Sequence, residues 1–352
     1  MTKFGVFLPV SGRAASRKTL MQAAQEAEAL GYDSVWAADR LVIPWKIGTT
    51  YPYSKEATFI VPPDRPFFDT MTCLAFLAGC TETIQLGMSV MVLPYRHPLH
   101  WSRIATTIDQ LSTGRLILGV GVGWMEEEFA AMNAPFKERG KVSDEQLTLL
   151  KQLWSEEHIT FHGKYYHVDD IAVLPKPYQK PRLPIWVGGE GKFAQRRAGQ
   201  FGDAWFPYFV KVTPEQLAAG YDNVRAEAKK AGRDPDQVQL ACCLPVELTT
   251  SDGPQITDYL KGSIEQVKER LQQFIAVGCV HIGLQFMIPH YPERREQIER
   301  FYGPGPMRRS FRAATFVFGD STLRELTDVL RFEADTIGSL GRAWLSTIPY
   351  RT

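Results

Sequence analysis

The chain has 352 residues, of which 44% are apolar and 22% charged, a composition typical of a soluble globular protein. Forty basic side chains balance 39 acidic ones, and a net charge of +1 gives no electrostatic footprint for nucleic acid and no polybasic segment for a membrane surface. The sequence shows no signal peptide, no apolar window long enough to span a bilayer and no disulfide spacing among its five cysteines. We therefore expect a cytoplasmic protein that binds neither nucleic acid nor membrane.

Short apolar runs alternate with longer segments of helical period over most of the chain. The expected strands lie at residues 4–8, 34–38, 84–92, 115–120, 185–187, 204–206, 238–248 and 280–286. Strands that alternate with crossover helices require a parallel sheet. Eight such units predict an α/β fold, a closed (β/α)8 TIM barrel with loop insertions, and an open doubly wound sheet is the alternative.

Capping residues mark several of the helix starts. The pairs are Thr19 with Gln22, Ser143 with Gln146, Thr213 with Gln216, and Ser263 with Gln266. Pro98 stands where the first turn of a helix tolerates a proline. These signals predict helices that begin close to each pair and at Pro98.

Three segments fall outside the barrel repeat. Residues 159–168 predict a β-hairpin, and the long loop at residues 41–69 is a candidate lid. We assign residues 1–302 to the barrel domain and residues 303–352 to a C-terminal helical extension. Within the extension, the apolar stripe of residues 321–337 predicts an amphipathic helix that packs on the barrel as its eighth outer helix or lies at a homodimer interface.

The working face of a barrel lies at the C-terminal ends of its strands, so polar residues there are candidates for catalysis. Asp39 and Arg40 end the second strand, where the Asp could hydrogen-bond a ring N–H or hold Arg40 in a salt bridge. His97 could transfer protons, or only cap the turn before Pro98. Aromatic residues at or beyond strand ends could line a substrate pocket, namely Trp45, Tyr95, Trp124 and Phe206.

Two glycine-rich segments follow strands on the same face. Gly119–Gly123 lacks the spacing of a dinucleotide fingerprint, so Gly121 and Gly123 serve either the approach of a flat ligand or close barrel packing. Gly188–Lys192 precedes a helix whose first N–H groups suit a phosphate, and Lys192 adds positive charge. The alternative for this second segment is an ordinary strand-to-helix turn.

Three further motifs receive a structural interpretation. Gly12–Thr19 nearly matches a phosphate-binding P-loop, but an arginine replaces the second glycine, which favours a solvated basic loop. Glu126–Glu128 begin a helix, where acidic residues suit the helix dipole. On the predicted hairpin, alternation places His158 and His162 on one face and His167 on the other, so we expect no metal site.

Several longer strings are similar to those of a known family. They are LGMSVMVLPYRHP at residues 86–98, ATTIDQLSTGRLILGVGVGW at residues 105–124, and PIWVGG at residues 184–189. The strings resemble the bacterial luciferase-like monooxygenase superfamily, in the branch that depends on the deazaflavin coenzyme F420. The resemblance extends over about residues 1–300.

This resemblance implies a TIM barrel with the deazaflavin ring in its mouth. It implies a non-proline cis peptide bond between Ser89 and Val90, whose bulge contacts the ring, and a phosphate site at the turn that begins with Gly188 and Gly189. Together with the glycines at the strand end described above, the candidate cofactor-binding residues are Asp39, Ser89, Val90, Met91, Gly121, Gly123, Gly188, Gly189, Glu190, Gly191 and Lys192.

Two positions depart from the family pattern. Arg40 stands where the deazaflavin branch often has a histidine, which argues against a histidine proton relay at this position. Trp124 stands where sugar-phosphate dehydrogenases of the family carry a catalytic acid, which argues against that substrate class.

The sequence thus leads us to expect an F420-dependent oxidoreductase that transfers a hydride between the deazaflavin C5 and an unidentified small organic substrate. Asp39, Arg40 and His97 are its candidate catalytic residues, and a homodimer is the expected assembly. The alternative is an FMN-dependent monooxygenase, with a reductase as the partner that supplies reduced cofactor. A non-catalytic flavin- or deazaflavin-binding protein is more distant, and a P-loop nucleotide hydrolase more distant still.

Overall fold

Eight parallel strands close into a barrel in the computed structural model, which describes residues 1–53, 59, 61–208, 213–252, 260–287 and 291–302. In barrel order the strands are β1 (Lys3–Phe7), β2 (Ser34–Ala37), β3 (Gln85–Met88), β5 (Leu116–Gly121), β8 (Ile185–Val187), β9 (Ala204–Trp205), β10 (Gln239–Leu248) and β12 (His281–Phe286). Strand β12 pairs in parallel with β1, which closes the barrel. The predicted (β/α)8 TIM barrel is therefore confirmed, and the open sheet is excluded.

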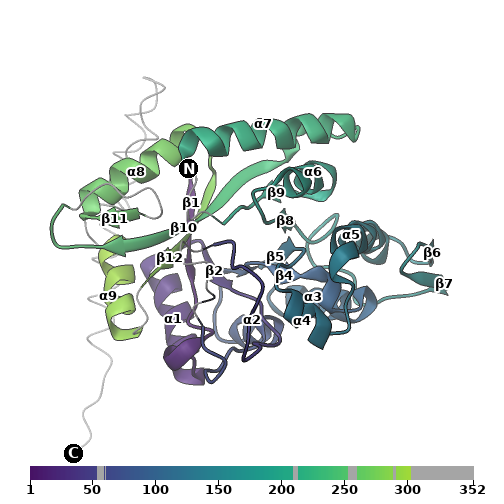
Figure 1. Ribbon diagram of the computed structural model, residues 1–352, viewed down its shortest axis with the longest axis horizontal. Coiled ribbons are helices and arrows are strands. Elements are labelled where there is room, and N and C mark those ends of the chain that lie inside the picture. The colour runs from purple at the N-terminus through teal and green to yellow at the C-terminus, as the bar shows by residue number, and fades with distance from the viewer. Residues whose placement is uncertain (54–58, 60, 209–212, 253–259, 288–290, 303–352) are drawn as a thin grey trace, which may run out of the picture. The chain divides into compact units, whose positions relative to one another are not determined.

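Helices follow most of the strands and cover the outside of the barrel (Figure 1). They are α1 (Arg17–Leu30), α2 (Thr70–Ala78), α3 (Pro98–Leu111), α4 (Glu126–Ala131), α5 (Arg139–Ser155), α6 (Lys192–Phe201), α7 (Pro214–Lys230), α8 (Ile264–Ala276) and α9 (Tyr291–Tyr302). Short 3-10 helices occur at Gly12–Ala14, Leu93–Tyr95, Phe136–Glu138 and Pro235–Gln237. None of the helices in the described ranges is long and apolar enough to cross a membrane.

Helix α9 was not predicted, and it takes the position of the eighth outer helix. It follows β12, and its Ile298 and Phe301 are buried. The ring of Phe301 lies 6.0 Å from that of Phe4 on β1, and the hydroxyl of Tyr32 donates to the carbonyl of Ile298. The extension at residues 303–352, with the helix predicted at residues 321–337, lies outside the described residues.

Two of the predicted helix starts are wrong. Helix α1 begins after Ser16, whose side chain accepts from the N–H of Thr19, so the cap lies three residues before the predicted one. Helix α5 begins at Arg139, and Ser143 lies inside it with its hydroxyl donating to the Arg139 carbonyl. Both errors arise because a Ser or Thr near the start of a helix imitates a cap.

The other two capping boxes are confirmed. Thr213 with Gln216 begins α7, and Ser263 with Gln266 begins α8, each with both hydrogen bonds of the capping box. Pro98 occupies the first position of α3, as predicted.

The predicted third strand is interrupted in its middle. It divides into β3 and the two-residue β4 (Met91–Val92), which pairs with β5. Between them, the peptide bond that joins Ser89 to Val90 is cis, as the resemblance implied. The interruption turns the half-buried side chain of Val90 toward the ends of β5 and β8.

Large aromatic side chains fill the interior of the barrel. The ring of Trp36 lies 4.5 Å from Phe206 and 5.3 Å from Trp186. At the N-terminal ends of the strands, Ser34 and His281 share a buried hydrogen bond of 2.8 Å. We call this end of the interior, with its Ser34–His281 pair, the barrel floor.

Two elements lie beside the barrel. Strand β11 (Leu260–Gly262) pairs in parallel with the C-terminal part of β10. Strands β6 (Ile159–His162) and β7 (His167–Ile171) form the predicted antiparallel hairpin, which projects beyond α5 in Figure 1. All five cysteines are free thiols.

Candidate active site

Asp39 follows β2 at the C-terminal end of the barrel, and its carboxylate is held by Arg96, which follows the 3-10 helix at Leu93–Tyr95. The two terminal nitrogens of Arg96 each donate to one Asp39 oxygen at 2.7 Å, and the N–H of Val92 donates at 3.0 Å. Asp39 is 7% exposed, and Arg96 also reaches Asp69 at 3.5 Å. The alternative that Asp39 holds Arg40 is therefore wrong, because Arg96 occupies both oxygens.

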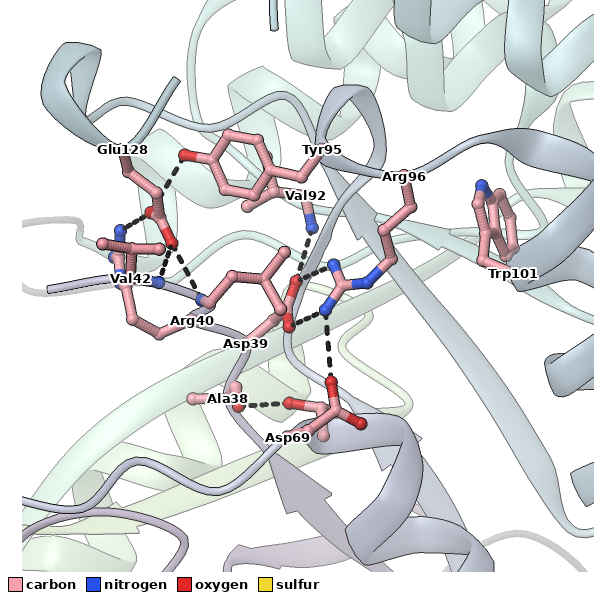
Figure 2. A network of polar contacts seen from close by, with 12 residues as sticks. Ala38, Asp39, Arg40, Val42, Asp69, Val92, Tyr95, Arg96, Trp101 and Glu128 are labelled. Carbon is pink, nitrogen blue, oxygen red and sulfur yellow. Dashed lines mark hydrogen bonds and ion pairs between the residues drawn. The ribbon is translucent and has the colours of Figure 1, made fainter. Parts of the chain in front are cut away.

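Arg40 pairs instead with Glu128 on α4, which has no exposed surface (Figure 2). The Glu128 carboxylate also accepts the N–H groups of Leu41 at 2.8 Å and Val42 at 3.1 Å and the hydroxyl of Tyr95 at 2.9 Å. Glu128 thus joins the ends of β2 and β4 to α4. Our interpretation of it as an acid that merely suits the helix dipole is wrong.

A group of aromatic rings lies beside this network. It consists of Tyr51, Tyr53, Phe59, Trp124 and Tyr208, and we call it the mouth cluster. Tyr51 lies 5.0 Å from Trp124 and 5.6 Å from Tyr53, which in turn lies 5.3 Å from Tyr208. The guanidinium of Arg40 stands 4.8 Å from the Phe59 ring and 5.2 Å from that of Trp124, close enough for cation–π attraction.

Three rings of the mouth cluster come from the loop at residues 41–69, which sequence analysis treated only as a candidate lid. Glu127 anchors this loop by accepting the N–H groups of Gly48 at 2.6 Å and Thr49 at 2.9 Å. Tyr53 then reaches Tyr208, which follows β9 on the opposite part of the barrel wall. The described residues of the loop that carry these rings therefore lie at the mouth, as a lid would require, and a movement of the loop stays a prediction.

The four residues predicted to line a substrate pocket lie in different surroundings. Trp124 belongs to the mouth cluster. Phe206 is 1% exposed and packs against Trp36 in the barrel interior. Tyr95 is 6% exposed and is bonded to Glu128, whereas Trp45 is 80% exposed. Only Trp124 therefore stands among rings that a ligand in the mouth could contact.

His97 is exposed at the start of α3, where its side chain makes no capping hydrogen bond. Its ring lies 5.4 Å from that of Tyr166, next to the β6–β7 hairpin. The structure does not bring it to the Asp39 or Glu128 pair among the contacts of the described residues.

The glycines at the ends of β5 and β8 make room for Val90. A Cβ on Gly121 would lie 2.6 Å from Val90 Cγ2, and one on Gly188 would lie 2.8 Å from Val90 Cγ1. A Cβ on Gly123 would meet Val92 and Phe129 at 2.7 Å. Barrel packing thus accounts for these glycines. Met91 is fully buried, and a cofactor contact at these positions remains a prediction.

The turn from Gly188 to Lys192 leads into α6 and exposes its N-terminus. Gly191 is the N-cap, has no side chain to cap the first turn, and has open space where a Cβ would stand. Lys192 is exposed, with its ammonium 5.3 Å from the Phe193 ring. A helix N-terminus in this state presents free N–H groups to an anion.

Glu190, in the same turn, is largely buried, and its Oε1 has no hydrogen-bond partner in the described part of the chain. Burial raises the pKa of its carboxyl to about 7, although the N–H groups of Glu190 and Tyr208 oppose the rise. Our sequence analysis placed Glu190 with the phosphate site only. Its charge acts on Tyr53 and Tyr208, which the sequence does not place beside it.

Two other motifs have structural roles. In the P-loop-like segment, the hydroxyl of Thr19 is 2.8 Å from that of Ser16, within the cap of α1. On the hairpin, His162 pairs directly with His167, and their rings stack 5.9 Å apart, so the prediction that they face opposite sides is wrong. No group of three or more metal-binding side chains gathers among the residues described.

Comparison with known proteins defines the class. The family described as luciferase-like monooxygenase matches residues 2–255, and the chain belongs to this family. The F420-dependent hydroxymycolic acid dehydrogenase of Mycobacterium tuberculosis is 32% identical over 219 residues, which cover 61% of this chain and 55% of that protein. The FMNH2-dependent dimethylsulfone monooxygenase of Pseudomonas putida is 31% identical over 167 residues, which cover 47% of this chain and 45% of that protein.

A solved F420-dependent secondary alcohol dehydrogenase, in complex with an F420–acetone adduct, has the same fold. It matches with a TM-score of 0.69 at 19% identity and covers 87% of this chain and 98% of its own. The chain thus spans about half the length of each of the two relatives above. Proteins of this family thus include both F420-dependent and FMN-dependent oxidoreductases.

Proposed function

We propose that the protein is an F420-dependent oxidoreductase that moves a hydride between the deazaflavin C5 and a small organic substrate. The bound deazaflavin supplies or accepts the hydride, and the protein binds, orients and shields the reactants. The relatives that depend on F420 support this choice of cofactor. A homodimer and a cytoplasmic location remain predictions.

The observation that carries the proposal is the position of the apolar bulge at Val90, which lies beside the Gly188–Lys192 turn that leads into α6. The side chain of Val90 stands next to Gly188, the first residue of that turn. A flat ring against Val90 would therefore have its phosphate-bearing tail near the open N-terminus of α6. The residues present thus fit a deazaflavin, with Val90 at the ring and Gly188–Lys192 at the phosphate.

FMN is the second candidate, because the same two features suit any flat ring that carries a phosphate. An FMN-dependent monooxygenase of Pseudomonas putida is among the relatives. In this alternative, a reductase supplies the reduced flavin and oxygen is consumed with product. A deazaflavin has carbon at position 5 and forms no flavin hydroperoxide, so oxygen uptake separates the two activities. A non-catalytic binding protein would hold a cofactor and turn over no substrate.

The deciding experiment is equilibrium binding of the purified protein to oxidised coenzyme F420 and, in parallel, to FMN, followed by fluorescence quenching. Tighter binding of F420 supports the proposal, and tighter binding of FMN favours the monooxygenase. Binding of neither would overturn both redox assignments.

A variant locates the phosphate end. Gly191→Asp places a carboxylate on the N-cap of α6, where it caps the helix well but repels a phosphate. We expect the affinity for F420 to fall about tenfold or more while the thermal stability stays equal or rises. An unchanged affinity would show that the phosphate binds elsewhere.

A further inference from the structure

Three carboxyl groups are buried or largely buried at the C-terminal end of the barrel, within the described ranges, and two of them are locked. Asp39 is held through both oxygens by Arg96, and Glu128 is held by Arg40, Tyr95 and two backbone N–H groups. A carboxylate bonded to a guanidinium is a poor proton acceptor, and a guanidinium does not give up its proton in proteins. Neither pair can therefore exchange protons with a ligand.

Glu190 is the third carboxyl group, and no arginine contacts it among the described residues. Its Oε1 is buried without a partner, and its own carbonyl oxygen accepts from Gln195 at 2.9 Å. The nearest cation along the chain, Lys192, directs its ammonium to the ring of Phe193. A buried carboxyl with one unsatisfied oxygen is a group whose missing partner can be a ligand.

The charge of Glu190 acts on two tyrosines of the mouth cluster, Tyr53 and Tyr208, which keep their protons. Burial raises the pKa of Tyr53, and it raises that of Tyr208 as well, with the charge of Glu190 adding to both increases. The pKa of Tyr51, next to Tyr53, is raised to about 12 by burial. The hydroxyl of Tyr208 donates to Gln285. None of these hydroxyls can accept a proton near neutral pH.

We propose that Glu190 gives and takes the proton when an alcohol or carbonyl substrate reacts at the mouth cluster, an inference that rests on the proposed function. In the oxidation of a secondary alcohol, the carbinol C–H bond breaks and its hydrogen leaves as hydride to the bound deazaflavin. The O–H bond breaks, its proton passes to the Glu190 carboxylate, and the C=O bond forms. In the reverse direction the Glu190 acid returns the proton to the carbonyl oxygen. An alcohol or ketone with an apolar body matches the rings around this carboxyl.

The first test uses the protein without any cofactor. Infrared difference spectra between acid and alkaline pH report the C=O stretch of a protonated carboxyl. We expect a band that disappears with a midpoint near the Glu190 pKa of about 7 in the wild type and is missing in Glu190→Gln. Glu269→Gln, an exposed acid on α8, is the matched control and should keep the band. A band that persists in Glu190→Gln, or none that titrates near neutrality, overturns the proposal.

The second test separates Glu190 from the proposed function. F420 binding is measured first, and then F420 reduction by cyclohexanol and 1-phenylethanol, with the matching ketones in reverse. We expect Glu190→Gln, assayed at an F420 concentration that saturates its own measured affinity, to lose turnover about a hundredfold or more, together with the limb of the pH profile near neutrality. Glu190→Asp should recover part of the rate.

The other outcomes of this second test show which part of the proposal fails. Full turnover by Glu190→Gln overturns the role of Glu190 and leaves the F420 assignment standing. Wild-type protein that binds F420 but converts none of these alcohols or ketones overturns the substrate class. Wild-type protein that binds no F420 overturns the proposed function itself, independently of the infrared result.

Discussion

The two ends of the barrel both bury a titratable side chain among aromatic rings, but only one end provides a partner for it. On the barrel floor, His281 and Ser34 are 2.8 Å apart, and Trp186 lies 5.0 Å from the imidazole ring. At the other end, Oε1 of Glu190 has no partner among the described residues. A satisfied buried pair serves packing, whereas an unsatisfied carboxyl at a catalytic face indicates a role toward a ligand.

Burial shifts the two groups in opposite directions, since it disfavours the charged form of each. The pKa of His281 falls to about 3, so this histidine is neutral throughout the physiological range. The pKa of Glu190 rises to about 7, so this carboxyl changes its charge within that range. The same physical effect therefore removes one group from acid–base chemistry and brings the other into it.

The largest effect is expected at the mouth, from breaking a buried ion pair. Glu128→Gln leaves Arg40 buried without its carboxylate and should cost about 3–5 kcal/mol in the free energy of unfolding, measured by urea denaturation. Glu127→Gln, one residue earlier, weakens hydrogen bonds to the loop backbone and to the hydroxyl of Thr49 and should cost about 1 kcal/mol. Equal costs in the two variants would contradict the central position of Glu128.

At the barrel floor, His281 should make the free energy of unfolding fall when the pH is lowered. Because the folded-state pKa of His281 lies below its ordinary value of 6.5, the unfolded chain binds a proton that the folded chain refuses. Stability is therefore lost as the pH falls from 6.5, by about 3 kcal/mol at pH 4. Urea denaturation of wild type and His281→Gln at several pH values isolates this part of the loss. Parallel pH dependences in both proteins would exclude His281 as its source.

At the mouth, Glu190 should make the free energy of unfolding fall when the pH is raised, the opposite of the effect of His281. The folded-state pKa of Glu190 lies above its ordinary value of 4.5, so the folded chain binds the proton more tightly and stability falls as the pH rises from 4.5 to about 7. The full rise in pKa corresponds to about 3 kcal/mol, reached above pH 7. Glu190→Gln should remove this slope and be the more stable protein at pH 8. Unfolding curves that coincide at pH 5 and at pH 8 would argue against a buried carboxyl.

The fold could be predicted largely from local patterns. Alternating strands and helices specify the barrel, because each strand and its crossover helix are neighbours in the chain. The break of the third strand into β3 and β4 did not appear in the apolar pattern, since residues 84–92 are mostly apolar and apolar residues stand on both sides of Ser89. Helix α9 was missed because its sequence is polar, with few positions that reveal the buried face of Ile298 and Phe301.

The mouth could be predicted only in part, because its pairs join distant segments. Asp39 was identified from its position after a strand, but its partner Arg96 lies 57 residues further along the chain. Glu126, Glu127 and Glu128 look alike in the sequence, and only burial distinguishes Glu128. Glu190 was noted for its glycine neighbours, whereas its burial and its buried, unpartnered Oε1 arise from the tertiary structure.

Substitutions of two glycines, one at each end of the barrel, test how tightly the two ends are packed. A Cβ on Gly5 at the floor would lie 2.1 Å from Ser34 Oγ and 2.3 Å from Trp36 Nε1, so Gly5→Ala should cost about 1–3 kcal/mol or more. Gly191→Ala at the mouth meets open space and should change the free energy of unfolding by no more than about 0.5 kcal/mol. Thermal unfolding measures both. A tolerated Gly5→Ala would mean that the Ser34–His281 pair can shift without cost.

The smallest effect is expected from the exposed lysine beside the α6 N-terminus. Lys192→Ala removes one solvated charge, which should weaken F420 binding by about 0.5–1 kcal/mol, or two- to fivefold, and leave stability unchanged. Screening by salt should reduce the difference between the two proteins, because exposed charges interact weakly beyond a Debye length. Binding titrations at low and high salt measure it, with Lys229→Ala on α7 as the control. A larger loss of F420 affinity that does not depend on salt would contradict this expectation. It would mean that Lys192 becomes buried against the cofactor when the cofactor binds.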